Sequence, residues 1–280
     1  LWRQNLGSEQ VGTQDNYFAI GGDSIRSMSL VADARKAGLY FAIRDLFAHP
    51  TIAALATVVR SGAAQQGGDA EVAPFALLSE SERAHLPRQV HGRAVQDAYP
   101  LSLLQQGMLF HSLRDPELNL YQNVLSFMLD LDWDESCFRR ALEQVAALHP
   151  VLRTAFHLDG ERPLQLVLPD APIHIEVFDL RGERQEDLRA LVLGIQDRVL
   201  ARGIDTAAPW RTFVCLLPGR LVRLNFVVHH ALMDGWSDAI LIKQVLQVYA
   251  PLLRGEAAPP VAAPPRYSNF IAQEQEALAS

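Results

Sequence analysis

Two short segments of this 280-residue sequence place reactive side chains beside flexible backbone. In the first, Ser24 directly follows Gly21, Gly22 and Asp23, at the predicted start of a helix. The glycines allow a tight turn, and a helix N-terminus offers free N–H groups with a partial positive charge. We therefore expect an exposed Ser24 hydroxyl that suits a phosphate-linked group. The alternative is that Ser24 or Asp23 only caps the helix.

The second segment reads HHALMDG over residues 229–235 and lies between a predicted strand and a predicted helix. A histidine at such a junction can accept or relay a proton near neutral pH. His230 is the candidate for this role, and Asp234 is a candidate to orient it. The competing interpretations are a zinc site and a purely structural histidine pair. Neighbouring residues of a strand point to opposite faces, which disfavours joint ligation by His229 and His230, so no metal is expected.

The elements around Ser24 are predicted to be helical. One helix is expected over residues 24–36, ended by Gly38 in the left-handed conformation that glycine favours. A second, amphipathic helix is expected over residues 50–59, with Thr51 as its cap. This part of the chain therefore predicts a small helical bundle with a modest core.

The elements around His230 alternate between helix and strand. Helical spacing over residues 135–148 predicts one helix, and residues 173–178 and 221–228 are typical of strands. A helix with one apolar face follows the histidines, and that face comprises Leu241, Val245, Val248, Tyr249 and Leu252. Strict alternation would put His230 on the apolar face of the strand with Val228. Either the alternation breaks after the strand or that face lines a cavity.

The composition excludes several classes of protein. Hydrophobic residues make up 49% of the chain and charged residues 20%, which is typical of globular domains. The net charge of −7 and the lack of a basic stripe argue against a nucleic-acid partner. No apolar stretch approaches the length of a membrane span. The two cysteines, Cys137 and Cys215, are too few for a disulfide framework, so we expect a cytoplasmic location.

A run of small and polar residues, SGAAQQGG over residues 61–68, divides the chain. Such a run buries too little apolar area to become ordered, which predicts a flexible linker. We expect one domain over residues 1–60, a linker over residues 61–72 and a second domain over residues 73–280.

The first domain resembles the thiolation, or peptidyl carrier, domains of nonribosomal peptide synthetases. The resemblance rests on DNYFAIGGDSI over residues 15–25 and on LFAHPTI over residues 46–52. It implies a four-helix bundle in which Ser24 carries a covalent 4′-phosphopantetheine arm derived from coenzyme A. The thiol of that arm would hold an aminoacyl or peptidyl group as a thioester.

The second domain resembles the N-terminal lobe of condensation domains. Four blocks carry the resemblance in the family's order: YPLSLLQQGMLFH at 99–111, LHPVLRTAF at 148–156, HHALMDG at 229–235 and RYSNF at 266–270. The resemblance implies an α/β lobe like that of chloramphenicol acetyltransferase, with the C-terminal lobe absent. The expected fold class of the whole chain is therefore α+β and multidomain.

The same resemblance implies a role for each residue of the second site. His230 and Gly235 would be catalytic. His230 would act as a general base on the attacking amine or as an electrostatic stabiliser of the transition state, and Gly235 would allow close backbone approach. His229, Asp234 and Arg153 would be structural at the active site, with Asp234 paired to Arg153.

The resemblance leaves an epimerisation domain or a dual epimerisation-condensation domain as alternatives to simple condensation. The GDS sequence of the carrier is similar to carriers that feed epimerising partners. Dual domains carry an additional His-His block where this chain has FHSL over residues 110–113, with Ser112 in place of the second histidine. The block over residues 105–111 is more similar to condensation domains, so simple condensation is preferred.

Together these resemblances imply nonribosomal peptide synthesis, with amide bond formation between the tethered thioester and a downstream acceptor. The expected partners are a phosphopantetheinyl transferase, an upstream adenylation domain, downstream adenylation and carrier domains, and aminoacyl or peptidyl thioesters. Neither nucleic acid nor membrane is expected. The 280 residues alone are expected to be inactive, and a carrier-binding fragment without turnover is the remaining alternative.

Overall fold

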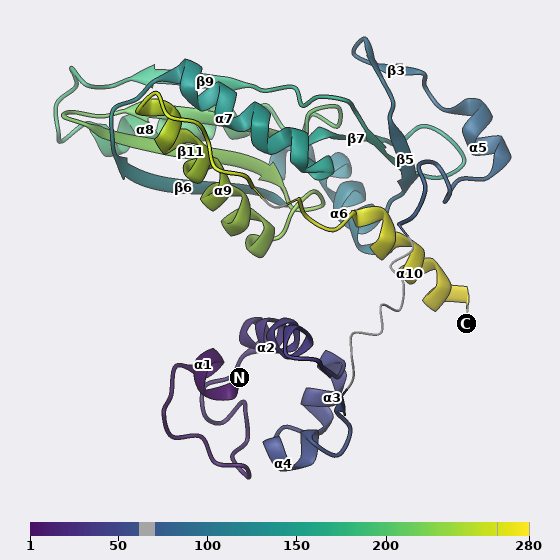
Figure 1. Ribbon diagram of the computed structural model, residues 1–280. Coiled ribbons are helices and arrows are strands. Elements are labelled where there is room, and N and C mark those ends of the chain that lie inside the picture. The colour runs from purple at the N-terminus through teal and green to yellow at the C-terminus, as the bar shows by residue number, and fades with distance from the viewer. Residues whose placement is uncertain (62–70, 262, 280) are drawn as a thin grey trace. The chain divides into compact units, whose positions relative to one another are not determined.

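A computed structural model describes residues 1–61, 71–261 and 263–279 (Figure 1). Some side chains of α2 (Ser24–Lys36), that of Ser24 among them, are outside the described part, and so are residues 62–70 of the predicted linker. The last two residues of that linker are described: Glu71 forms an ion pair with Arg266 at 2.6 Å, and Val72 N donates to the Asn269 side chain at 3.1 Å. The chain divides into two compact units, Leu1–Ala70 and Glu71–Ser280. Each unit has its own hydrophobic core.

The first unit is a small helical bundle. Besides α2 it contains α1 (Trp2–Leu6), α3 (Ile43–Ala48), α4 (Ile52–Leu55) and one antiparallel pair, β1 (Leu39–Tyr40) with β2 (Arg60–Ser61). Its core comprises Trp2, Leu6, Tyr17, Leu30, Leu46 and Leu55. The predicted four-helix bundle is confirmed.

The helix ends of this unit agree with the local sequence signals, except at the end of α4. Gly38 has φ 75° just beyond α2, as predicted. The Thr51 hydroxyl accepts a hydrogen bond from Ala54 N, which confirms the predicted cap. However, α4 ends at Leu55 and not near residue 59. Beyond it, Thr57 donates to the carbonyl of Ala54 from both its backbone N (3.1 Å) and its hydroxyl (2.7 Å), so the last turn is tightened into an i to i−3 arrangement.

The second unit is built on a four-stranded sheet with the order β6-β11-β10-β9. Its strands are β6 (Gln122–Asp130), β9 (Ile175–Asp179), β10 (Trp210–Leu216) and β11 (Leu221–His229). The helix α8 (Leu188–Leu200) connects β9 to the parallel strand β10, while the other two pairs are antiparallel. The predicted α/β alternation is confirmed.

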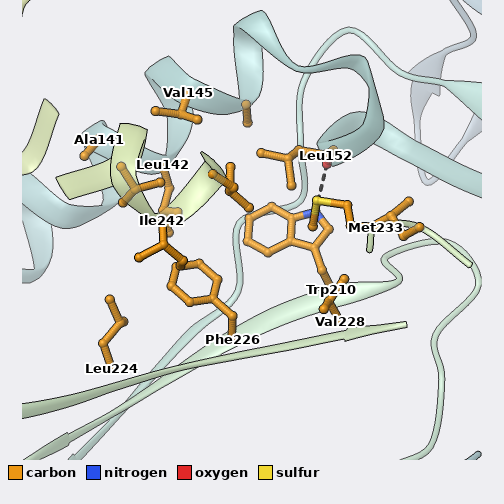
Figure 2. Close-up of a cluster of buried hydrophobic side chains, with 14 of the residues drawn as sticks. Ala141, Leu142, Val145, Leu152, Trp210, Leu224, Phe226, Val228, Met233 and Ile242 are labelled. Carbon is orange, nitrogen blue, oxygen red and sulfur yellow. Dashed lines mark hydrogen bonds between the residues drawn. The ribbon is translucent and has the colours of Figure 1, made fainter. Parts of the chain in front are cut away.

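Helices cover both faces of this sheet. The side chains of Val222, Leu224, Phe226 and Val228 on β11 share one core with α7 (Glu135–Leu148) and α9 (Gly235–Leu253). Figure 2 shows Leu142 and Ile242, from these two helices, meeting Phe226. On the opposite face, Val227 belongs to a separate core with α8. Alternate β11 side chains therefore point to different layers, as a strand between two helical layers requires.

A second, three-stranded sheet has the order β5-β8-β7, from β5 (Asp97–Pro100), β7 (Thr154–His157) and β8 (Leu164–Val167). The remaining elements are α5 (Glu80–His85), the hairpin β3 (Gln89–Val90) with β4 (Arg93–Ala94), α6 (Leu103–Arg114), η1 (Pro116–Leu118), η2 (Pro150–Arg153) and α10 (Tyr267–Ala279). Among the described helices, none combines the length and the apolar character that crossing a bilayer would require.

The predicted elements of this unit have nearly the observed bounds. The helix α7 covers the predicted residues, and Asp134 caps it by accepting from Cys137 N at 2.8 Å. The strand predicted over residues 173–178 is β9, which begins two residues later. The strand predicted over residues 221–228 is β11, which continues to His229.

Candidate active site

His230 lies in the turn between the end of β11 and the start of α9. The strand ends one residue earlier, at His229, so the alternation breaks before His230, as one of the two expectations required. Its backbone N donates to the carbonyl of Tyr121 at 2.8 Å. Asp234 is the N-cap of α9, and its side chain accepts from Ser237 N at 2.9 Å. The predicted junction of strand and helix is therefore observed.

Two groups contact Nδ1 of His230, the carbonyl of Met233 at 3.1 Å and the Asn123 side-chain nitrogen at 3.2 Å. A carbonyl only accepts, so the Met233 contact requires a proton on Nδ1, whereas an amide N–H requires a lone pair there. With the proton directed to Met233, the lone pair of His230 is on Nε2. No residue in the described ranges forms a hydrogen bond with Nε2. His230 thus presents a basic nitrogen.

The Met233 carbonyl is fixed by its own side chain. That side chain is buried in the main core, and Figure 2 shows it between Leu152 and Trp210. The Trp210 indole N–H donates to the carbonyl of Leu152 at 2.8 Å, which fixes the ring against which Met233 packs. Core packing therefore orients the group that selects the protonated nitrogen of His230.

The cavity beside His230 has a volume of about 370 Å³. Its walls come from α6, η2, the His230 turn, α9 and the segment before α10, and they include Met108, Val151, Leu241, Pro264 and Tyr267. Most of these side chains are apolar. The imidazole is one of the few groups in the wall that can exchange a proton.

His229 is buried and has a structural arrangement. Only 1% of it is exposed, its Nδ1 accepts from Ala231 N at 3.2 Å, and its Nε2 lies 2.8 Å from the Ser112 hydroxyl. Because Nδ1 accepts, Nε2 carries the proton and donates to Ser112. Burial, followed by the charge of His230, lowers the pKa of His229 to about 4. His229 is therefore neutral near pH 7.

The two nitrogens of His229 are thus both engaged, which leaves it no lone pair for a metal. Within the part of the chain that the structure describes, no three His, Cys, Asp or Glu side chains form a group that could hold a metal ion.

The predicted ion pair between Asp234 and Arg153 is wrong. The Arg153 guanidinium donates to the carbonyls of Ala146 (3.0 Å) and Leu168 and to the Gln96 side chain (3.0 Å). Asp234 instead caps α9. Arg153 therefore binds backbone carbonyls where α7, η2 and β8 meet. The carboxylate of Asp234 serves as the N-cap of α9.

Sequence reasoning missed the role of Gln105. Its side-chain nitrogen donates to the carbonyl of Ala231 at 2.8 Å, and its oxygen accepts from Gln165 at 2.9 Å. The same oxygen accepts from Ser102 N at the start of α6, which forms a capping box. The Ser-x-x-Gln spacing was visible in the sequence and predicts that box, but it gives no sign of the contact with Ala231. Gln105 therefore connects α6 to the residue beside His230.

At the first site, Ser24 is the first residue of α2. The cap of this helix is Asp23, whose carboxylate accepts from Arg26 N at 2.7 Å, so the alternative cap role belongs to Asp23. Gly22 is required for close packing, because a Cβ there would lie 2.3 Å from the ring of Tyr17. The exposure of the Ser24 hydroxyl concerns a side chain outside the described part and stays a prediction.

The surroundings of this helix start fit a phosphodiester. Gly21 has φ 103°, a conformation that glycine adopts without strain. The exposed Arg26 side chain donates to the Gly21 carbonyl at 2.8 Å, which holds a cation near the N-terminus of α2. Both the helix end and the guanidinium favour an anion at this place.

Comparison with protein families agrees with this two-part arrangement. Residues 95–280 match the family described as condensation domain, and residues 1–59 match the family described as phosphopantetheine attachment site. AMB antimetabolite synthetase AmbE of Pseudomonas aeruginosa is 35% identical over 291 residues, covering 100% of this chain and 14% of that protein. A linear gramicidin synthase protein of Brevibacillus parabrevis is 31% identical over 288 residues, covering 99% of this chain and 5% of that protein.

Solved structures show the same fold for the second unit. The first condensation domain of the calcium-dependent antibiotic synthetase, in complex with a substrate analogue, aligns with a TM-score of 0.58 and 25% identity, covering 65% of this chain and 44% of that chain. The starter condensation domain of rhizomide synthetase aligns with a TM-score of 0.54 and 19% identity, covering 59% of this chain and 42% of that chain. The predicted fold class is confirmed.

Proposed function

Because this chain belongs to the condensation-domain family and carries a phosphopantetheine attachment domain ahead of it, we propose that it serves nonribosomal peptide synthesis. Ser24 holds the donor acyl group through 4′-phosphopantetheine, and His230 promotes amide bond formation with a downstream acceptor. The observation that carries this proposal is the His230 ring, held through Nδ1 by the carbonyl of Met233 beside a cavity.

The reaction joins an amine to a thioester carbonyl. As the C–N bond forms and the C–S bond breaks, the proton lost by the amine passes to Nε2 of His230 and then to the departing sulfur. The imidazolium formed in between keeps its Nδ1–H bond to Met233. A positive ring also stabilises negative charge on the carbonyl oxygen, so the base and electrostatic roles both fit this geometry.

The other residues of the site support His230. His229, through Ser112 and Ala231, and Gln105, through Ala231, fix the turn that carries the ring. Gly235 starts α9, and a Cβ there would meet no atom within 4 Å. No described atom therefore requires glycine at this position, and its proposed role is to let substrate approach the backbone.

When bound at Ser24, the pantetheine arm supplies a thiol that forms the thioester. The partners in this proposal are a phosphopantetheinyl transferase, an upstream adenylation domain, and downstream adenylation and carrier domains. The chain spans 14% or less of the two curated relatives named above, and 44% of the aligned condensation-domain chain. We therefore infer that the 280 residues alone bind substrate without turnover, because the tunnel of this family needs a second lobe.

We prefer simple condensation to the epimerising alternatives. Ser112, at the position where dual domains carry a histidine, is buried, and its hydroxyl is engaged with His229 and the carbonyls of Met108 and Leu120. No proton-transferring group is found at this position. Deuterium exchange at Cα of the tethered residue in the full-length synthetase tests this preference, since exchange would contradict it and peptide formation without exchange would exclude the epimerising alternatives.

Mass spectrometry tests the carrier role directly. Incubation with a phosphopantetheinyl transferase and coenzyme A should add about 340 Da to the chain, from the formula of the arm. Ser24→Ala should abolish the gain, and Ser29→Ala, on the same helix, should retain it. An unmodified wild-type chain, or a modified Ser24→Ala chain, would exclude Ser24 as the attachment site.

A further inference from the structure

The His230 ring has two partners at a single nitrogen, and they require opposite protonation states. The Met233 carbonyl lies 3.1 Å from Nδ1, and the Asn123 side-chain nitrogen lies 3.2 Å from the same atom. The carbonyl binds only a protonated Nδ1, whereas the amide N–H binds only an unprotonated one. A neutral ring therefore forms one of these two hydrogen bonds at a time.

The sheet fixes Asn123 beside this ring. Asn123 is the second residue of β6 and pairs with Val228 of β11. The residue before β6, Tyr121, accepts from His230 N at 2.8 Å. Cross-strand partners share a face of the sheet, so Asn123 faces the layer that contains Val228 and Met233 (Figure 2). Strand register therefore sets the contact between Asn123 and Nδ1.

The other β6 side chains on this face are apolar. Leu125, Phe127 and Leu129 follow Asn123 at alternate positions and pack against the main core. The Asn123 side chain is half-buried, and among the described residues the His230 ring is its one hydrogen-bond partner. A polar side chain that loses water on burial needs such a partner. The place of Asn123 in this apolar row is therefore explained by the ring that it contacts.

The two contacts are nearly equal in length, so neither partner dominates. Neutral hydrogen bonds have similar net strengths, and the two protonation patterns should be populated within about tenfold of each other. The bond to Met233 leaves a lone pair on Nε2, which accepts a proton. The bond to Asn123 leaves the proton on Nε2, which then donates a hydrogen bond. The partner at Nδ1 therefore decides what His230 offers at Nε2.

We propose that Asn123 is a positioning residue that holds His230 as the Nε2–H tautomer, in which the ring donates a hydrogen bond to the thioester carbonyl. Met233 holds the other tautomer, in which the ring acts as a base. The electrostatic and base roles of His230 then belong to two tautomers of one ring, each selected by its own partner. This inference rests on the proposed function and adds the residue that separates its two roles.

The test measures which nitrogen carries the proton, without turnover. The 280-residue chain is labelled with ¹⁵N in its histidine rings and observed by NMR at about pH 8.5, above the usual histidine pKa of about 6.5. Protonated and unprotonated ring nitrogens have well-separated chemical shifts, and the signals that disappear in His230→Ala assign the ring. At least about a tenth of the wild-type His230 rings should carry the proton on Nε2.

Two substitutions assign the effect to Asn123. Asn123→Val removes the amide donor and should lower the Nε2–H fraction at least about fivefold. Asn123→Asp keeps the size but offers only acceptors, so it should lower the fraction as well. Ser126→Ala, on the same strand, removes a hydroxyl that binds Asn225 and should leave the fraction unchanged. The ring of His229, protonated on Nε2, should be unchanged in every variant and reports that the site is folded.

Two results would overturn the proposal: a wild-type His230 ring protonated only on Nδ1, or an Nε2–H fraction that neither Asn123 variant lowers. The wild-type measurement decides the first of these even if a variant does not fold. The experiment needs neither the pantetheine arm nor amide bond formation. Its failure would leave the base role of His230 and the Ser24 mass test intact, so the two proposals fail separately.

Discussion

The Nε2 of His229 lies 2.8 Å from the Ser112 hydroxyl, across 117 residues of sequence. Ser112 in turn lies within 3.0 Å of the carbonyls of Met108 and Leu120, so it accepts from the imidazole and donates to the backbone. This chain of hydrogen bonds keeps His229 in one tautomer, while burial lowers its pKa and keeps it neutral. It connects α6 to the end of β11, and through Ala231 it positions the turn of His230.

Removal of this hydroxyl should destabilise the second unit. Ser112→Ala leaves the buried Nε2–H of His229 without an acceptor, which costs about 1–3 kcal/mol of unfolding free energy. Urea denaturation followed by near-UV circular dichroism measures the loss. Ser136→Ala, which removes an exposed hydroxyl beside the α7 cap, is the control and should change the free energy by less than about 0.5 kcal/mol. Equal effects of the two variants would contradict a role for the Ser112 bond.

His230→Ala should reduce amide bond formation with little effect on folding. In the complete synthetase we expect a rate lower by about 10²–10⁴-fold, the usual contribution of a proton-transferring side chain. Product formation is measured by mass spectrometry with a preloaded donor carrier. His174→Gln, an exposed histidine before β9, is the matched control and should retain the wild-type rate. A His230→Ala rate within a factor of two of the wild type would exclude the proposed role.

Arg153 and Asp234 should contribute independently to stability. Arg153→Met removes the donor for two carbonyls and should cost about 1–3 kcal/mol. Asp234→Asn keeps a capping oxygen and should cost less than about 1 kcal/mol. The double variant should equal the sum within about 0.5 kcal/mol, because the two side chains share no contact. A larger coupling energy in this cycle would restore the ion pair that the sequence predicted.

The buried side chains of His229 and Asp238 should make the unfolding free energy depend on pH in opposite directions over the same range. The folded pKa of His229, about 4, is below its unfolded value, so the unfolded chain binds the additional proton and stability rises with pH from about 4 to 6.5. The folded pKa of Asp238, about 6, is above its unfolded value of 3.8, so the folded chain binds the additional proton in this range. The contribution of Asp238 to the unfolding free energy is therefore complete below pH 3.8 and is lost as the pH rises to about 6. The two dependences partly cancel.

Asp238→Asn should therefore expose the His229 dependence. Relative to the wild type, the unfolding free energy of the variant should rise by up to about 3 kcal/mol between pH 4 and 6.5, since one pKa unit corresponds to about 1.4 kcal/mol. Urea denaturation at several pH values measures it. Asp234 and His230 influence Asp238 and are unchanged in both proteins. If the difference in unfolding free energy between the variant and the wild type is the same at every pH in this range, the pKa of Asp238 is not raised in the folded state.

Gly22 should be essential to the first unit. A Cβ at this position would lie 2.3 Å from the Tyr17 ring and 2.6 Å from its carbonyl oxygen, so Gly22→Ala should cost about 1–3 kcal/mol. Gly107, inside α6, has no atom within 4 Å of a built Cβ. Gly107→Ala should instead stabilise the second unit by up to about 1 kcal/mol through helix propensity. Thermal unfolding of each variant distinguishes these opposite signs.

The sequence determined the features that depend on neighbouring residues. The bounds of α2 and α7 follow from local caps and from the spacing of apolar side chains, and Thr51 and Asp134 cap their helices from one residue away. The junction of β11 with α9 was likewise predicted, because a polar turn separates two different periodicities. The two family resemblances rest on such local blocks, and they also indicated the fold.

Only the tertiary structure decided which distant groups meet. The carbonyl partners of Arg153, the bond between Ser112 and His229, and the burial of Asp238 all depend on how α6, α7 and α9 pack on the sheet. Asp238 gives no local sign of burial, because an aspartate in the first turn of a helix is ordinarily exposed and favourable. Helix caps are satisfied within four residues, whereas the solvation and partners of a side chain are set by segments a hundred residues away.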